Sequence, residues 1–236
     1  MITDIKATVN QMPLAAYTEG NEEMPAMSKL GELFTADWKQ RLIRAGLAWQ
    51  VQVGGITAGA DISPVVGGGN GTTMDTDQPE LCVGVPSGYY LIPMEAHVAT
   101  YAHSVTDKTI NTILLFADRT QSVADTAAAS STVVTPVNLL DGATGSGTPL
   151  AQKAYTADVT DPVCSEILDF ACNETLAATG SATVQGLKMD YMPQAPSILA
   201  GPCQVVLCWG SVNASGASGI GTIKVAVVPS SYFPTA

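Results

Sequence analysis

The feature that most constrains the fold of this chain is a two-residue alternation of apolar and polar side chains in short segments. In residues 47–55 (LAWQVQVGG), Trp49, Val51 and Val53 would share one face of a strand, and the two glutamines between them would share the other. Similar short apolar segments recur through the 236 residues, separated by clusters of Gly, Pro, Asn, Asp and Ser. This pattern predicts an all-β fold, either a sandwich or a barrel.

We expect about eight to ten strands in one antiparallel β-sandwich. Residues 109–117 have a continuous apolar centre, which is typical of a strand covered on both faces. Two further strands are expected at 203–212 and 220–229, and the turn-rich NASGASG between them could close a hairpin. The other expected strands are 89–101, 133–140, 163–171 and 183–192.

The segment 89–101 predicts one buried and one exposed face. The side chains expected to point inward are Tyr90, Ile92, Met94, Ala96 and Val98. Pro93, Glu95 and His97 would then point outward. Because Pro93 cannot donate a hydrogen bond to a neighbouring strand, we expect it at a sheet edge or at a β-bulge.

One helix is expected, over residues 36–45. Thr35 is the expected N-cap, and Gly46 is well placed to end the helix. Its apolar stripe is expected to pack on the sandwich or on a neighbouring subunit, and consists of Trp38, Leu42 and Ala45.

We expect residues 1–46 to form an N-terminal arm with this helix, and 47–236 to form the sandwich with a C-terminal tail. Both terminal segments carry aromatic side chains that would suit contacts with the domain or with a neighbouring copy. The residues predicted at such a subunit interface are Phe34, Trp38, Tyr232 and Phe233.

The charge of the chain argues against a nucleic-acid-binding protein. There are 21 acidic residues against 10 basic ones, so the formal net charge of −11 would repel phosphate backbones. The basic residues before position 45 are interspersed with acidic ones, so no basic arm is predicted. Only 13% of residues are charged, against roughly 25–35% on the surface of a typical free domain. Such a surface suits a protein whose faces are covered by copies of itself.

The chain offers no signal for secretion or for a membrane span. The first 20 residues lack the apolar core of a secretory signal, so we expect synthesis and folding inside a cell. The most apolar stretch, 197–212, is interrupted by Gly201, Pro202 and Gly210 and is too short to span a bilayer. Contact with an internal membrane stays open as an alternative.

The five cysteines predict neither a disulfide framework nor a metal site. They form an odd set without a CxxC pair, and we expect buried, reduced thiols. Cys203 and Cys208 are five residues apart, which places them on opposite faces of a strand. No metal and no cofactor is expected. The cysteines are Cys82, Cys164, Cys172, Cys203 and Cys208.

Candidate catalytic groups are few, and no catalytic residue is assigned. Glu95 and His97 share a strand face and could form a metal pair or an acid–base dyad, but a polar outward stripe is favoured because no third ligand has a recognisable spacing. The GGGNG at 67–71 lacks the Lys-Ser or Lys-Thr of a phosphate-binding loop. An acidic stretch could be a glycosidase pair, a calcium loop or a solvated rim, and contains Asp158, Asp161, Glu166, Asp169 and Glu174.

The layout of the chain resembles a family of viral proteins. After an arm and a short helix come LAWQVQVGG, VGVPSGYYLIPMEAHVATYAH and TILLFADRT, and the chain ends in LAGPCQVVLCWGSVNASGASGIGTIKVAVVPSSYFP. Over 47–233 this order resembles the jelly-roll major coat proteins of tailless icosahedral viruses, especially phages. The resemblance implies two four-stranded sheets packed face to face, with loops and arms that make subunit contacts and with no active site.

This resemblance leads to an expected function. The chain would be a structural capsid protein that assembles with itself into an icosahedral shell, and it would reside in the virion after assembly in the host cytoplasm. Because a basic arm is absent, the resemblance implies a shell filled by a packaging motor, lined by membrane or assisted by other virion proteins. Two alternatives stay open. One is a carbohydrate-binding or fibre/pilus module that uses exposed aromatic rings, and the other is a hydrolase on a β scaffold.

Overall fold

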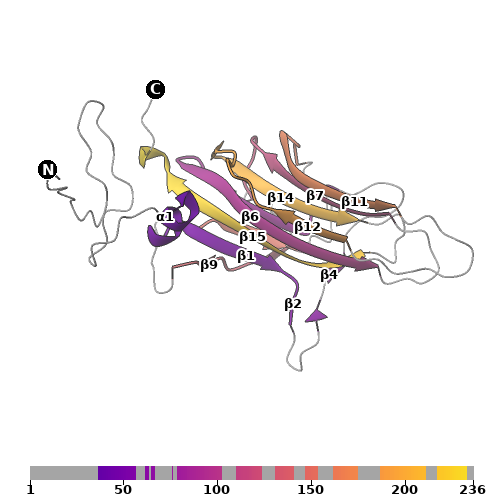
Figure 1. Cartoon of the computed structure of the whole chain (residues 1–236). Helices are drawn as coiled ribbons and strands as arrows, with labels where there is room; N and C mark the ends of the chain where they lie inside the picture. Colours follow the sequence, from indigo (N-terminus) through magenta and orange to yellow (C-terminus); the bar gives the residue numbers. More distant parts are fainter. Residues whose placement is uncertain are drawn as a thin grey trace, which may run out of the picture.

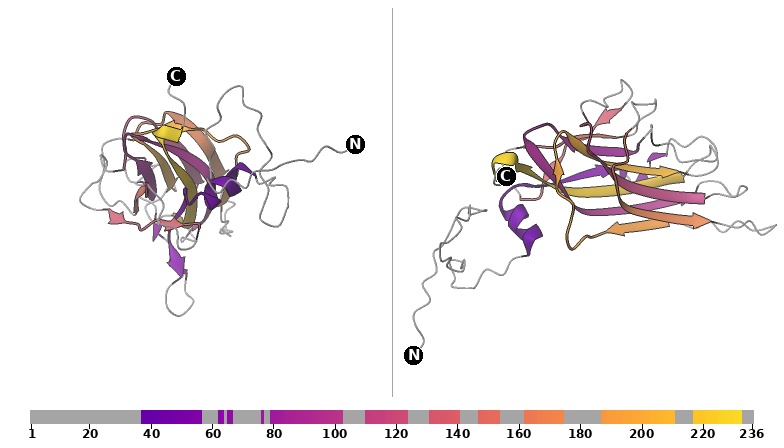
Figure 2. Two further views of the ribbon diagram at one scale, coloured as in Figure 1. Left: turned by 90° about the vertical axis from the view of Figure 1, so that its left-hand side faces the viewer. Right: turned by 90° about the horizontal axis from the view of Figure 1, so that it is seen from above.

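The protein is a sandwich of two antiparallel β-sheets packed face to face, as the alternating segments predict (Figures 1 and 2). The computed structural model describes residues 37–56, 62–63, 65–66, 76, 79–102, 110–123, 131–140, 147–153, 162–174, 187–210 and 217–232. Within these segments the helical elements are α1 (Trp38–Arg44) and the short 3-10 turn η1 (Ser230–Tyr232). In the same segments, no helix has both the length and the apolar character needed to cross a membrane.

The strands fall into two main sheets and a small ribbon. The first sheet runs in the order β12 (Leu187–Tyr191), β6 (Tyr89–Ala102), β15 (Ala217–Pro229), β1 (Ala48–Val53) and β9 (Val137–Asn138), with β13 (Leu199–Ala200) on β6 and β4 (Val65–Val66) on β15. The second sheet runs in the order β11 (Glu166–Glu174), β7 (Ile110–Asp118), β14 (Cys203–Gly210), β5 (Leu81–Val85), β10 (Leu150–Lys153) and β8 (Thr132–Val133). The ribbon pairs β2 (Gly55–Ile56) with β3 (Ile62–Ser63).

Eight of these strands have five or more residues: β1, β5, β6, β7, β11, β12, β14 and β15. Numbered one to eight along the chain, they lie in the order six, three, eight, one in the first sheet and five, four, seven, two in the second. Every connection between consecutive long strands therefore changes sheet, except the one from β7 to β11. The predicted hairpin at NASGASG is wrong, because β14 pairs with β5 and β7 whereas β15 pairs with β1 and β6.

The core lies between the two sheets and confirms the alternation predicted for β1. Trp49, Val51 and Val53 of β1 point into it. They meet two further alternating sets, from β14 (Cys203, Val205, Leu207 and Trp209) and β15 (Ile223, Val225 and Val227). The remaining residues of β14 face the other side, so Cys203 and Cys208 do lie on opposite faces as predicted.

A β-bulge in β6 corrects the predicted inward face of that strand. Glu95 pairs with Lys224 whereas Pro93 pairs with Val225, which leaves Met94 as the extra residue. Ala96 and Val98 lie in the inter-sheet core as predicted. Ile92 and Met94 instead pack on the outer face, and the half-buried Tyr90 pairs with Val228 of that same outer cluster. Pro93 lies beside the bulge, which is one of its two predicted settings, but it is buried and pairs with the core residue Val225, so it does not point outward as predicted.

Helix α1 covers part of the outer face of the first sheet (Figure 2). Its buried Leu42 and half-buried Trp38 and Ala45 pack on an apolar cluster formed by Leu47, Ala48, Ile92, Met94, Ala226 and Val228. The N-cap is Asp37, whose side chain accepts a hydrogen bond from the Lys39 amide at 2.8 Å, and not the predicted Thr35, which lies outside the described residues. Gly46 follows the helix with a φ of 70°, a conformation that favours glycine.

Several strands differ from their expected bounds. β5 was not expected, and all five of its residues are buried. The expected strand 133–140 is two short strands, β8 and β9, which pair with β10 and β1 respectively, so this segment crosses from the second sheet to the first. The strand expected at 163–171 runs over Glu166–Glu174, and that expected at 183–192 is described over Leu187–Tyr191.

Candidate functional site

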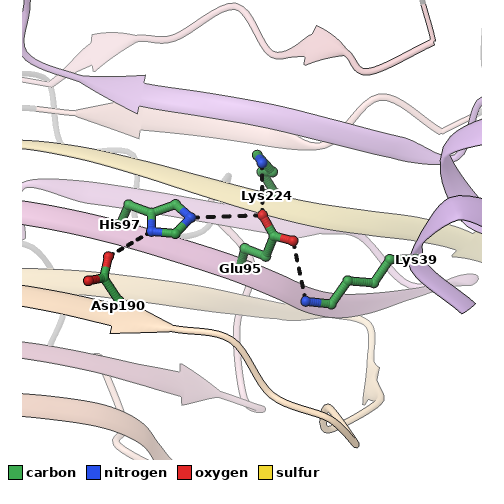
Figure 3. A network of polar contacts seen from close by, with 5 residues as sticks. All are labelled: Lys39, Glu95, His97, Asp190 and Lys224. Carbon is green, nitrogen blue, oxygen red and sulfur yellow. Dashed lines mark hydrogen bonds and ion pairs between the residues drawn. The ribbon is translucent and has the colours of Figure 1, made fainter. Parts of the chain in front are cut away.

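A polar network lies on the outer face of the first sheet, next to helix α1 (Figure 3). Glu95 of β6 is at its centre, with 20% of its side chain exposed. One carboxylate oxygen accepts a hydrogen bond from Lys224 Nζ of β15 at 2.8 Å, and the other accepts one from Lys39 Nζ of α1 at 3.3 Å. The network thus ties the helix to two neighbouring strands.

The two lysines decide the charge of Glu95. Partial burial alone would raise the pKa of this carboxyl group, but the hydrogen bonds and positive charges of Lys224 and Lys39 outweigh it and lower the pKa below the usual 4.5. Glu95 is therefore a carboxylate at neutral pH. A general acid requires the opposite shift, so this arrangement does not favour Glu95 as the general acid of the hydrolase alternative.

His97 lies beside Glu95 on the same strand face, as the sequence predicts. Its Nδ1 is 2.8 Å from Asp190 Oδ1 of β12, and its Nε2 is 3.8 Å from Glu95 Oε2. The side chains of His97 and Asp190 are 42% and 65% exposed, so the pair is solvated. Within the described segments, no group of three or more His, Cys, Asp or Glu residues is arranged to hold a metal ion.

The two members of the acidic stretch whose hydrogen bonds are described, Glu166 and Asp169, have different partners. Glu166 is bound by Arg119 Nη2 at 2.6 Å and by the hydroxyl of Ser197. Hydrogen bonding from Ser197, aided by Arg119, outweighs burial and lowers the pKa of Glu166. Asp169 accepts a hydrogen bond from the amide of Phe170. Asp158 and Asp161 lie outside the described residues, and Glu174 ends β11.

Two buried carboxyl groups that the sequence did not reveal organise the second sheet. Asp118 at the end of β7 is fully buried and accepts hydrogen bonds from the Thr120 amide and hydroxyl, the Val163 amide and Gln204 Nε2. Burial would raise the pKa of Asp118, but the hydrogen bonds from Thr120 and Gln204 lower it. Glu80 is 2% exposed and accepts a hydrogen bond from the Trp209 amide at 2.7 Å, just beyond the end of the β5–β14 ladder. Asp118 and Glu80 therefore stabilise the second sheet by accepting hydrogen bonds from neighbouring segments.

The residues predicted at a subunit interface differ in how far they are exposed. Trp38 is half-buried against the apolar cluster under α1, and Lys39 Nζ lies 5.6 Å from the centre of its ring. Tyr232 is 44% exposed in η1, directly after β15. Phe34 and Phe233 lie outside the described residues. Tyr232 therefore stays available for a contact, whereas much of Trp38 is used within the chain.

The cysteines and tryptophans divide between core and surface. Cys82, Cys203 and Cys208 are buried and form no disulfide, as predicted, and burial raises the pKa of Cys203 to about 12. The prediction is wrong for Cys164 and Cys172, which are free but exposed. Trp49 and Trp209 are 6% and 1% exposed, so both serve the core and neither is placed to stack on a sugar.

Large apolar side chains that stay exposed gather on the two lateral edges of the sandwich. The first, termed the β11 edge, exposes Val163, Ile167, Phe170, Met192 and Ile198. The second, termed the β8–β9 edge, exposes Val133, Val137, Leu140 and Leu150. The sheet orders place β11 and β12 at one side and β8 and β9 at the other. Among the described residues, Tyr232 is the remaining exposed large apolar side chain.

Comparison of the chain with protein-family models, curated proteins and solved structures finds no significant match. Three geometric features bear on function: the order of the long strands, the neutralised polar network and the two apolar edges.

Proposed function

We propose that this chain is a structural coat subunit that assembles with copies of itself into an icosahedral viral shell. The observation that carries the proposal is the pairing of the eight long strands. The first pairs with the eighth, the second with the seventh, the third with the sixth and the fourth with the fifth. Eight strands joined in four such pairs, and folded into two four-stranded sheets, are the expected topology of a jelly roll, a fold used by capsid subunits and also by lectins.

The surface of the protein favours self-assembly over a monomeric state. Exposed apolar patches mark interaction sites, and here they lie on both lateral edges of the sandwich. The low fraction of charged residues, 13% of the chain, points the same way. With the net charge of −11, the partners proposed are other copies of this chain and other virion proteins, and direct binding of the genome is not part of the proposal. Contact with an internal membrane remains compatible with this assignment.

The two alternative functions find less support in the described residues. A carbohydrate-binding module needs exposed rings on a face, and Trp49 and Trp209 are buried. A hydrolase that used Glu95 as its general acid would need this carboxyl group to hold a proton near neutrality, and Lys39 and Lys224 disfavour that state. The proposal therefore includes neither catalysis nor a cofactor.

Particle formation tests the proposal directly. The purified protein should form large, closed homo-oligomers, visible by negative-stain electron microscopy and by sedimentation velocity, in a manner that depends on protein and salt concentration. A species that stays monomeric up to high protein concentration, with and without calcium and across salt concentrations, would contradict it. Binding on a glycan array by such a monomer would instead support the carbohydrate-binding alternative.

A further inference from the structure

The two lateral edges differ in structure as well as in position. On the β11 edge, the pairing with β7 shifts between Ile167 and Asp169, so Leu168 is an extra residue in a β-bulge. Residues three apart on a regular strand face opposite sides, but the bulge places both Ile167 and Phe170 on the outer side of the sheet. Their exposed fractions are 58% and 66%. The bulge thus builds an apolar surface on an edge strand.

The segments that form the β8–β9 edge close the opposite side of the sandwich. Residues 131–140 run from β8 in the second sheet to β9 in the first, and Val134 between them packs against the core. Val133 and Val137 point away from the core and are 75% and 63% exposed. This edge is therefore apolar too, although different strands build it.

The charges of the two edges are complementary. Glu166, Asp169 and Glu174 all belong to β11, and Arg119 is bound to the first of them. Residues 131–140 and 147–153 of the opposite edge contain Lys153 and no acidic residue. Among the described residues, neither Asp169 nor Lys153 has an oppositely charged partner. If the β11 edges of two copies faced each other, acidic residues would oppose acidic residues. If the β11 edge of one copy faced the β8–β9 edge of another, they would not.

We propose that copies of this chain assemble side by side and head to tail, with the β11 edge of one copy against the β8–β9 edge of the next. This inference rests on the proposed self-assembly and specifies its geometry. The contact joins two different surfaces. An assembly of any number of copies in a row therefore still has one free β11 edge and one free β8–β9 edge. The contact therefore propagates, and it closes into a ring or continues as an open chain according to the rotation between neighbours.

Two variants that each block one edge provide the test. The first is a double variant that blocks the β8–β9 edge and carries both Val133→Asp and Val137→Asp. The second is a double variant that blocks the β11 edge and carries both Ile167→Asp and Phe170→Asp. All four positions are exposed, so circular dichroism and thermal melting should show folded proteins close to the wild type. Ala99→Asp, at an exposed position of β6 that is not among the residues defining either edge, is the control and should assemble as the wild type does.

Sedimentation velocity should find each blocked variant monomeric at concentrations where the wild type is assembled, with at least a tenfold loss of the assembled fraction. An equimolar mixture of the two variants should form dimers of one copy each and nothing larger, because a single intact pair of edges remains. Mass spectrometry of the dimers identifies their composition.

The remaining outcomes overturn the inference in distinguishable ways. If either variant alone forms dimers through its intact edge, the contact is two-fold and the head-to-tail geometry is wrong. If the wild type assembles but the mixture stays monomeric, the two edges are not each other's partners. If the wild type itself never assembles, the proposed function fails, and the inference fails with it.

Discussion

The outer face of the first sheet is partly charged, whereas the outer face of the second sheet is apolar at its centre. On the first sheet, α1 covers an apolar cluster and Glu95 anchors the adjoining polar network. On the second sheet, the side chains of Cys82, Phe116, Val206 and Cys208 are completely buried. Apolar burial persists over a wide range of pH and salt, while an ionic network depends on both. The two faces should therefore respond differently to mutation and to solution conditions.

Removing the largest side chain from the outer face of the second sheet should have the largest effect. Phe116→Ala is expected to lower the free energy of unfolding by about 3–5 kcal/mol, because it leaves a cavity in a fully buried cluster. Urea denaturation measures the change. Phe170→Ala on the same sheet is the control, since a side chain that is 66% exposed should contribute less than about 0.5 kcal/mol. Equal losses in the two variants would show that the buried face contributes nothing special.

Shortening the buried side chain of helix α1, which packs on the first sheet, should have an intermediate effect on the free energy of unfolding. Leu42→Ala is expected to cost about 2–3 kcal/mol, because Leu42 is the buried contact of α1 but the short helix can shift to fill part of the space. Hydrogen exchange should become faster in α1 while β14 keeps its protection. Gln40→Ala, on the exposed side of the helix, is the matched control. Faster exchange in β14 as well would mean that α1 is not a separate covering layer.

Neutralising the centre of the polar network should have a smaller and pH-dependent effect. Glu95→Gln is expected to cost about 1–2 kcal/mol at pH 7, because Lys39 and Lys224 lose their shared anion. The folded-state pKa of Glu95 is lowered, so its contribution is fully present above the ordinary pKa near 4.5 and is lost as pH falls through the lower folded value. The stability difference between wild type and variant should therefore shrink below pH 4.5. A constant difference down to pH 2 would contradict this assignment.

Sequence patterns predicted the sandwich because side-chain alternation is local, and β1, β14 and β15 confirm it. The errors arise where tertiary structure overrides a local pattern. NASGASG has the composition of a hairpin turn, yet its flanking strands belong to different sheets. β5 has no alternation to detect because both of its faces are buried. In β6, Pro93 indicated an irregularity but not which residue would be inserted.

The candidate site could be predicted only in part, for a similar reason. Glu95 and His97 are two residues apart, so their shared outward face follows from strand geometry alone. The two lysines that determine the chemistry of Glu95 come from positions 56 and 129 residues away along the chain. No local spacing encodes such contacts. The exposed Ile167 and Phe170 depend likewise on a bulge that appears only once β11 pairs with β7.

The smallest effect is expected at the rim of the polar network. His97→Ala removes the contact with Asp190, but both side chains are well exposed, so the change in stability should stay below about 0.5 kcal/mol. Assembly of the variant, followed by sedimentation velocity, should match the wild type, because His97 belongs to neither lateral edge. Asp190→Ala should likewise change stability by less than about 0.5 kcal/mol. A large loss of assembly in the His97→Ala variant, with stability unchanged, would move the subunit contact from the edges to the outer face of the first sheet.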